Sequence, residues 1–165
     1  MNRRRGGTEM FGYYDMAVIG LRNELFQDDS FGIRVARRLK ALNIEPIDVI
    51  EAAEGELADH LARYRTAIVV YSFHDSENGE VIEMNLGAGR EKVTSLPRSG
   101  AKLPDALLRW QENAPTLPEL IKVYCVPQAT LSGAGGRRPA PKGVRVRTVV
   151  NRILHALGII EKTKG

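Results

Sequence analysis

One stretch decides the fold of this chain: Ala17-Val18-Ile19-Gly20-Leu21-Arg22-Asn23-Glu24-Leu25-Phe26-Gln27-Asp28-Asp29-Ser30-Phe31-Gly32. Its apolar run ends at Gly20, a short loop follows, and the adjacent carboxylates Asp28 and Asp29 precede a helical pattern. In an open α/β sheet such a loop lies at the carboxyl end of a strand, where ligand sites usually form. Two neighbouring acids there need a cation, a proton or a donor to compensate them. The stretch therefore predicts a strand, a functional loop and a helix.

The segments around this stretch alternate between strand-like and helix-like patterns. Short apolar, β-branched or alternating runs predict five strands, at residues 14–20, 47–51, 67–71, 80–84 and 119–126. Apolar residues at helical spacing predict four helices, at 30–42, 55–64, 103–110 and 146–157. We expect Leu42 and Leu108 to lie on the apolar faces of their helices.

This order of elements predicts a three-layer αβα sandwich with a mostly parallel five-stranded sheet, of the phosphorylase/hydrolase-like type. Only a short polar turn separates 67–71 from 80–84, so we expect these two strands to form a hairpin, with 80–84 as the one antiparallel strand at a sheet edge. A chain of 165 residues suits one core. We expect a single domain at 14–160, a flexible N-terminal tail at 1–13 and a tail at 161–165.

Composition and charge exclude several classes of protein. Hydrophobic residues make up 43% and charged residues 27%, as in globular domains. No apolar run is long enough to cross a membrane, and no apolar segment of an export signal follows the N-terminal arginines, so we expect a cytoplasmic protein without a membrane partner. The net charge of +4 gathers partly at 137–147, where aromatics and nucleic-acid motifs are absent. Solvated charge and an acidic protein partner remain open, and a nucleic-acid partner is disfavoured.

The single cysteine, Cys125, lies in an apolar strand-like run. One cysteine cannot form an internal disulfide or supply a cysteine zinc site. We expect a buried thiol that packs as a small hydrophobe and is not a nucleophile.

The opening stretch resembles the signature of the [NiFe]-hydrogenase maturation proteases, Gly-x-Gly-Asn-x-Leu-x-x-Asp-(Asp/Glu)-x-x-Gly. The residues that match it in order and spacing are Gly20, Asn23, Leu25, Asp28, Asp29 and Gly32. Arg22 departs from the second glycine. The resemblance continues through the apolar strand ending at Tyr71 and through Val126-Pro127 to the C-terminal helix, and so covers nearly the whole domain.

The resemblance implies an endopeptidase that removes a C-terminal peptide from the hydrogenase large subunit after nickel insertion. In this family three residues contact nickel presented by the substrate, and the enzyme has no cofactor of its own. They are the second acid of the signature, an aspartate ending the third strand, and a histidine in the loop before the third helix. Asp29 matches the first, and the resemblance makes it the candidate catalytic and metal-contacting residue. The other two positions fall on Ser72 and Ser99.

His74 and Asp75 are candidate replacements for the two unmatched contacts. They follow Ser72 by two and three residues, at the same end of the sheet as Asp29. An imidazole and carboxylates suit nickel or another borderline divalent metal. The alternative is that residues 74–76 are simply a polar turn, because turns favour Asp and Ser.

Structural roles compete with functional ones for the signature residues. Asp28 can cap the helix or accept backbone N–H groups, and capping is also an alternative for Asp29. Asn23 is expected to hold the loop by hydrogen bonds, and Gly20 and Gly32 to permit close backbone approach. The resemblance leaves two functions open. One is a maturation endopeptidase; the other is a proteolytically inactive relative that binds a hydrogenase precursor or another hydrogenase assembly protein.

Overall fold

The computed structural model describes residues 16–22, 30–44, 47–74, 79–87, 104–113, 118–128 and 142–158. Their elements follow in the order β1 (Met16–Arg22), α2 (Phe31–Leu42), β2 (Asp48–Ala53), η2 (Glu54–Glu56), α3 (Leu57–Leu61), β3 (Thr66–His74), β4 (Ile82–Gly87), α4 (Asp105–Asn113), β5 (Leu120–Gln128) and α5 (Lys142–Ala156). The tails predicted at 1–13 and 161–165 lie outside the described residues, so these domain boundaries stay predictions.

The five strands form one mixed sheet in the order β2-β1-β3-β5-β4. β1 pairs in parallel with β2 and β3, and β3 pairs in parallel with β5. β4 is antiparallel and lies at an edge, as its alternating sequence predicts. The central strand β3 is buried through most of its length, which explains its continuous run of apolar and β-branched residues.

The predicted hairpin between β3 and β4 is wrong. β4 pairs with β5, with Met84 opposite Val123, and β5 lies between β4 and β3. β5 is almost entirely buried beyond its first residues, whereas β4 alternates exposed and buried residues. Placing β5 inside the sheet buries both of its faces and leaves the half-polar strand at the edge.

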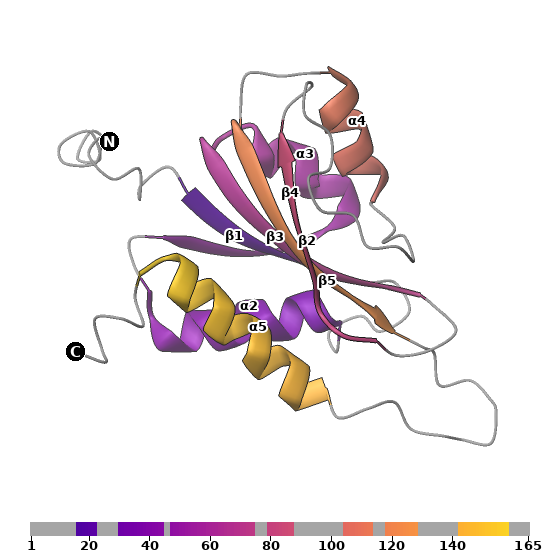
Figure 1. Cartoon of the computed structure of the whole chain (residues 1–165). Coiled ribbons are helices and arrows are strands. Elements are labelled where there is room, and N and C mark those ends of the chain that lie inside the picture. Colours follow the sequence, from indigo (N-terminus) through magenta and orange to yellow (C-terminus); the bar gives the residue numbers. More distant parts are fainter. Residues whose placement is uncertain are drawn as a thin grey trace, which may run out of the picture.

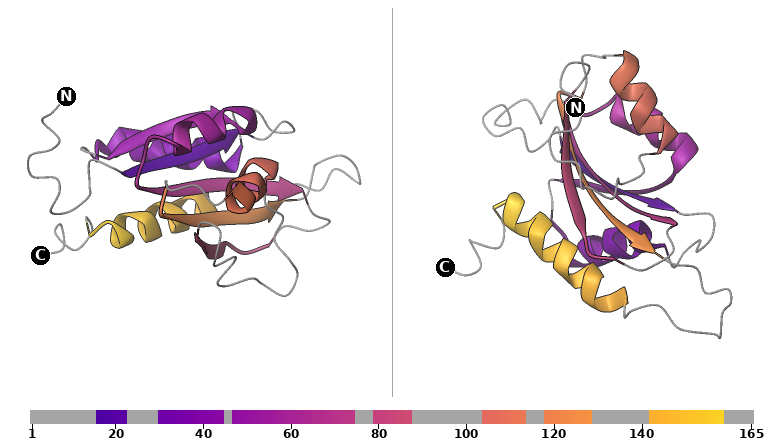
Figure 2. Two further views of the ribbon diagram at one scale, coloured as in Figure 1. Left: turned by 90° about the horizontal axis from the view of Figure 1, so that it is seen from above. Right: turned by 45° about the vertical axis from the view of Figure 1, so that its right-hand side comes forward.

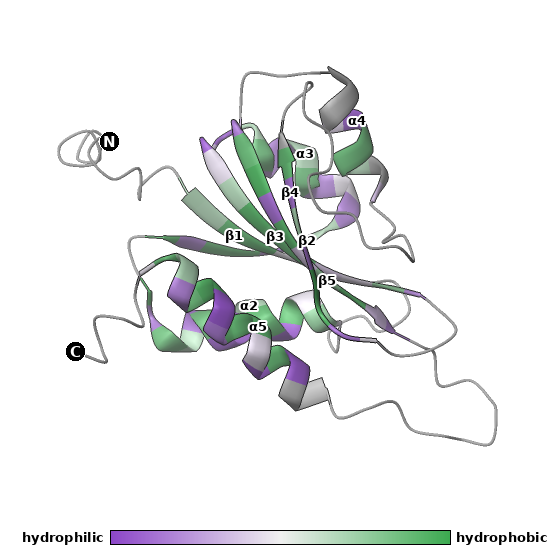
Figure 3. Cartoon of the chain, in the orientation of Figure 1, coloured by the Kyte–Doolittle hydropathy of each residue, from purple (hydrophilic) through white to green (hydrophobic). Residues whose placement is uncertain are grey.

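Two helices cover each face of the sheet, and this confirms the three-layer sandwich (Figures 1 and 2). Helices α2 and α5 pack on one face over a core that includes Val18, Val70 and Val126. Helices α3 and α4 pack on the other face over Ile19 and Tyr71 among others. Figure 3 shows apolar residues concentrated along the sheet and on the helix surfaces that meet it. Among the described residues, no helix is long and apolar enough to cross a membrane.

Two leucines expected on apolar helix faces are exposed instead. Leu42 is 48% exposed, because α2 ends there and Asn43 turns the chain with a left-handed φ of 55°. Ile44, at 7% exposure, takes its place in the core. Leu108 is 42% exposed because Leu107 next to it faces the sheet, and adjacent helical residues point in directions about 100° apart.

The two signature glycines pack directly on each other. A Cβ added to Gly20 in β1 would clash with the carbonyl oxygen of Gly32 and would lie 2.7 Å from its carbonyl carbon. A Cβ added to Gly32 in α2 would lie 2.6 Å from the backbone nitrogen of Leu21. The predicted close approach is confirmed. Because this contact joins β1 to the first turn of α2, it fixes the positions of the two elements that residues 23–29 connect.

Replacing Gly32 with alanine should therefore destabilise the protein. The obstructing atoms are backbone, so α2 must move away from β1, at a cost of about 1–3 kcal/mol in the free energy of unfolding. Urea denaturation followed by circular dichroism measures this loss. Gly55→Ala is the control, because nothing lies within 4 Å of a Cβ there. Equal effects of the two substitutions would contradict the packing explanation.

An ion-pair cluster ties α2 to the edge strand β2. The Arg37 guanidinium and the Lys40 ammonium donate to the Glu51 carboxylate over 3.2 and 3.1 Å. The Arg37 hydrogen bond, together with Lys40, holds the pKa of Glu51 below its ordinary value of 4.5. Both cations are about half exposed, so solvent screening limits the stabilisation to roughly 0.5–1 kcal/mol.

The contribution of Glu51 should depend on pH. Its pKa is lower in the folded than in the unfolded chain, so its stabilisation is complete above 4.5 and is lost as the pH falls below that value. Glu51→Gln should lower stability by about 0.5–1 kcal/mol at pH 7 and by less near pH 3. Denaturation midpoints at the two pH values test this. A constant difference, or the same profile for the exposed Glu119→Gln, would refute the assignment.

Candidate functional site

Polar side chains gather on one face of the sheet where the parallel strands end. Side chains alternate between faces along a strand. Val18, Val70 and Val126 all face α2 and α5, so residues an even number of positions further along face the same way. The members of this set at the carboxyl ends are Arg22 on β1, Ser72 and His74 on β3, and Gln128 on β5. We call these four residues the edge cluster.

Of the candidate metal ligands Asp29, His74 and Asp75, only His74 lies among the described residues. It ends β3, it is exposed, and it pairs with Gln128 in the parallel register. Ser72 is 7% exposed on the same face, about 6.6 Å back along the strand. An imidazole at position 74 thus points to the same side of the sheet as the side chain at position 72, but nearer to solvent.

The remaining candidates fall outside the described residues. They are Asn23, Asp28 and Asp29 in the first loop, Asp75 after β3, and Ser99 in the loop before α4. Within the part of the chain that the structure describes, no three histidine, cysteine or acidic side chains form a group able to hold a metal ion. The grouping of Asp29, His74 and Asp75 around nickel therefore stays a prediction, as do capping by Asp28 and loop structuring by Asn23.

Sequence reasoning missed two residues at this edge. The Gln128 side chain is 1% exposed, and neither of its amide atoms has a hydrogen-bond partner among the residues that the structure describes. Arg145, in the first turn of α5, is half-buried and donates from Nη1 to the backbone oxygens of Gly79 and Pro127. In the sequence Gln128 is one polar residue after Val-Pro, and Arg145 is one of several cations in a basic region. Only their burial in the folded structure distinguishes Gln128 and Arg145 from other polar and basic residues of the chain.

Cys125 lies on the opposite face of β5 and is fully buried. Burial raises the pKa of its thiol to about 12, while a hydrogen bond from the Tyr71 side chain acts in the other direction. A thiol this buried is almost entirely protonated at neutral pH, whereas the thiolate is the reactive species. The expected role as a small hydrophobe agrees with this position.

A thiol-specific chromogenic reagent at pH 8 should therefore not modify Cys125 in the native protein. Unfolding in urea should release one reactive thiol per chain, because the sequence has a single cysteine. The rate of colour development, measured with and without denaturant, tests this. Rapid modification of the native protein would show an accessible thiolate and would reopen a nucleophilic role.

Comparisons with known proteins agree with the resemblance in the sequence. No family model and no curated protein matches the chain. Among solved structures, a hydrogenase 2 maturation peptidase from a Thaumarchaeota archaeon is similar, with 20% identity and a TM-score of 0.60 over 87% of this chain and 98% of that one.

Two further structures are similar over most of both chains. The hydrogenase maturating endopeptidase HybD from E. coli has 17% identity and a TM-score of 0.54, over 86% of this chain and 91% of its own. The [NiFe] hydrogenase maturation protease HycI from Thermococcus kodakarensis has 19% identity and a TM-score of 0.53, over 90% and 96%. The chain has the α/β fold of the hydrogenase maturation proteases.

Proposed function

We propose that this protein is a divergent hydrogenase maturation endopeptidase, which removes a C-terminal peptide from a [NiFe]-hydrogenase large-subunit precursor after metal insertion. One observation carries the proposal: the contact between Gly20 and Gly32 accounts physically for two glycines of the signature. The same contact sets both ends of the loop that contains Asp28 and Asp29. Three solved structures with a similar fold are a hydrogenase maturation peptidase, endopeptidase and protease.

We propose that Asp29 and His74 contact the nickel ion in the precursor. Carboxylate oxygen and imidazole nitrogen both suit a borderline divalent metal. His74 lies on the face of the sheet that packs against α2, and Asp29 immediately precedes the N-cap residue of that helix. Asp75 is the proposed third contact. The metal belongs to the substrate, and these residues serve to recognise a precursor that has received it.

The partner and location follow from the same proposal. The proposed partner is the hydrogenase large-subunit precursor, and the proposed location is the cytoplasm. The sequence supports this through the absence of an apolar segment long enough to span a membrane.

A binding module without proteolytic activity is the second candidate. Ser72 favours it, because a hydroxyl stands where the family has a metal-contacting aspartate, and Ser99 occupies the position of the family's histidine. A relative of this kind would dock on a hydrogenase precursor or another assembly protein and leave its C-terminus intact.

The deciding experiment incubates purified protein with a nickel-loaded large-subunit precursor and follows the precursor's mass by mass spectrometry. The wild type should shorten the precursor at its C-terminus. Asp29→Ala should abolish cleavage, and His74→Ala should lower its rate about tenfold or more, because each removes a metal contact.

His155→Ala is the matched control, since His155 is an exposed histidine on α5 outside the edge cluster. Its rate should equal that of the wild type. Binding of the precursor without any change in mass would favour the binding module. Full activity of Asp29→Ala would contradict the proposed role of that residue.

A further inference from the structure

The helical layer formed by α2 and α5 carries cations and no acids. Residues 31–42 and 142–156 include arginines and lysines, but neither range contains an aspartate or a glutamate. The two helices pack against each other on one face of the sheet (Figures 1 and 2). On the other face, η2 and α3 carry the exposed acids Glu54, Glu56 and Asp59. Positive charge is therefore concentrated on the α2–α5 layer.

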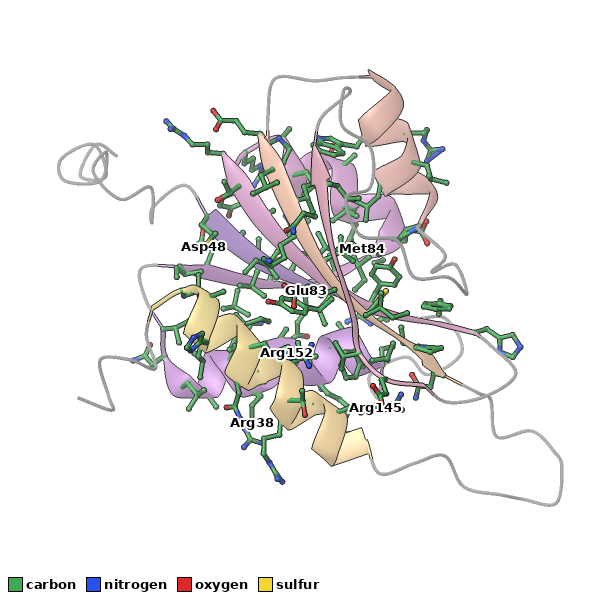
Figure 4. The ribbon with its side chains drawn as sticks, viewed as in Figure 1. Arg38, Asp48, Glu83, Met84, Arg145 and Arg152 are labelled. Carbon is green, nitrogen blue, oxygen red and sulfur yellow. The ribbon has the colours of Figure 1, made fainter. Side chains whose placement is uncertain are left out.

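One exposed arginine of α2 faces away from the acid of the nearest edge strand. Arg37 and Lys40 bind Glu51 on β2, and this defines the side of α2 that faces that edge of the sheet. Successive helical residues are about 100° apart, so Arg38 lies about 160° around the helix from Lys40. Arg38 is exposed and has no ion pair or hydrogen bond with another described residue. Figure 4 shows its side chain pointing away from the sheet.

The same arrangement occurs on α5, at the opposite edge of the sheet. Arg152 lies 4.0 Å from Glu83 on β4, and Arg145 donates to the Gly79 oxygen shortly before that strand. Arg147 is two residues beyond Arg145, so it lies about 160° around the helix from the side that faces β4. It is exposed, and within the described part of the chain it has no ion pair or hydrogen bond. Because α2 lies on the other side of α5 from β4, Arg147 turns toward α2.

Arg38 and Arg147 thus lie on the neighbouring sides of two packed helices. The glutamates of the edge strands compensate the outer flanks of the layer, and no described acid compensates these two arginines. Leu42 follows Arg38 by four residues on the same stripe of α2 and is 48% exposed. We call Arg38, Leu42 and Arg147 the seam surface. Like charges on one exposed surface create a positive potential that attracts an acidic partner.

We propose that the seam surface docks an acidic surface of the hydrogenase large-subunit precursor. Phosphates of a nucleic acid also bind arginine, but the described residues of α2 and α5 expose no aromatic ring on which bases could stack. An exposed leucine beside arginines suits a protein interface, where apolar and arginine side chains are combined. The inference rests on the proposed function, which supplies the precursor as partner.

The seam surface would contact the precursor away from its cleavage point. α2 starts at the carboxyl edge of the sheet and runs back along β1, so Leu42 at its C-terminal end lies at the opposite end of the layer from the edge cluster. The C-terminal extension of the precursor would approach the edge cluster. The seam surface would therefore bind another part of the precursor and contribute to its capture.

The double substitution Arg38→Glu with Arg147→Glu tests the seam surface, because it reverses both charges at exposed positions. Biolayer interferometry measures the binding of nickel-loaded precursor at low and high concentrations of sodium chloride. At low salt the association rate constant should fall about tenfold or more, and its dependence on salt should weaken, because charge complementarity acts mainly on association. In the cleavage assay KM should rise and kcat should change little.

Arg63→Glu with Arg109→Glu is the matched control. It makes the same change in net charge at two exposed arginines, one just after α3 and one on α4, and should lower the association rate much less. Arg38→Lys with Arg147→Lys keeps both charges and should retain binding. Leu42→Ser leaves the charge unchanged and should weaken precursor binding several-fold, because it removes an apolar contact. Thermal melts followed by circular dichroism check that each variant is folded.

The outcomes separate this inference from the proposed function. If the charge-reversed variant binds the precursor as the wild type does, the docking surface is refuted, even where the wild type cleaves the precursor. If the wild type binds the precursor without cleaving it and charge reversal weakens that binding, the docking surface stands and the endopeptidase activity falls. If charge reversal abolishes binding of a single-stranded RNA oligonucleotide and leaves precursor binding unchanged, the surface serves nucleic acid and the inference is overturned. A wild type that does not bind the precursor contradicts both proposals.

Discussion

The contact between Gly20 and Gly32 is the constraint on which the rest of this structure depends. Backbone meets backbone there, so α2 lies against β1 more closely than any side chain would permit. A carbonyl oxygen cannot move aside as a side-chain end can, and the two positions are therefore restricted to glycine together. The contact brings the N-terminus of α2 to the carboxyl end of β1, and with it the start and the end of the loop that contains both acids.

The two faces of the sheet differ in charge, and the candidate site lies on the basic one. The described residues of α2 and α5 include arginines and lysines but no aspartate or glutamate. Their carboxylate partners come from the sheet: Glu51 binds Arg37 and Lys40, and Glu83 lies 4.0 Å from Arg152. Figure 4 shows Glu83 and Arg152 between the sheet and α5. A positive helical layer favours acidic groups near it.

Two polar residues of β3 lie on the same face of the sheet at this edge. Ser72 stands where the resemblance places an aspartate, but His74, two residues on, points to the same side because side chains alternate. A polar side chain two residues further along the strand stays on the same face of the sheet but lies nearer to solvent. Gln128 on the next strand adds a group of a different kind, buried and neutral, beside the exposed imidazole.

The sequence by itself determined the elements, the three layers, the edge position of β4 and the need for close backbone approach at Gly20 and at Gly32, because periodicity and glycine positions are local properties. Tertiary structure alone decided that β5 lies between β3 and β4, since that pairing joins segments distant in the chain and depends on which strand gains most from burial. It also decided that Leu42 and Leu108 face solvent. The burial of Gln128 and Arg145 was likewise invisible in the sequence, because whether a polar side chain is paired depends on neighbours that only the fold supplies.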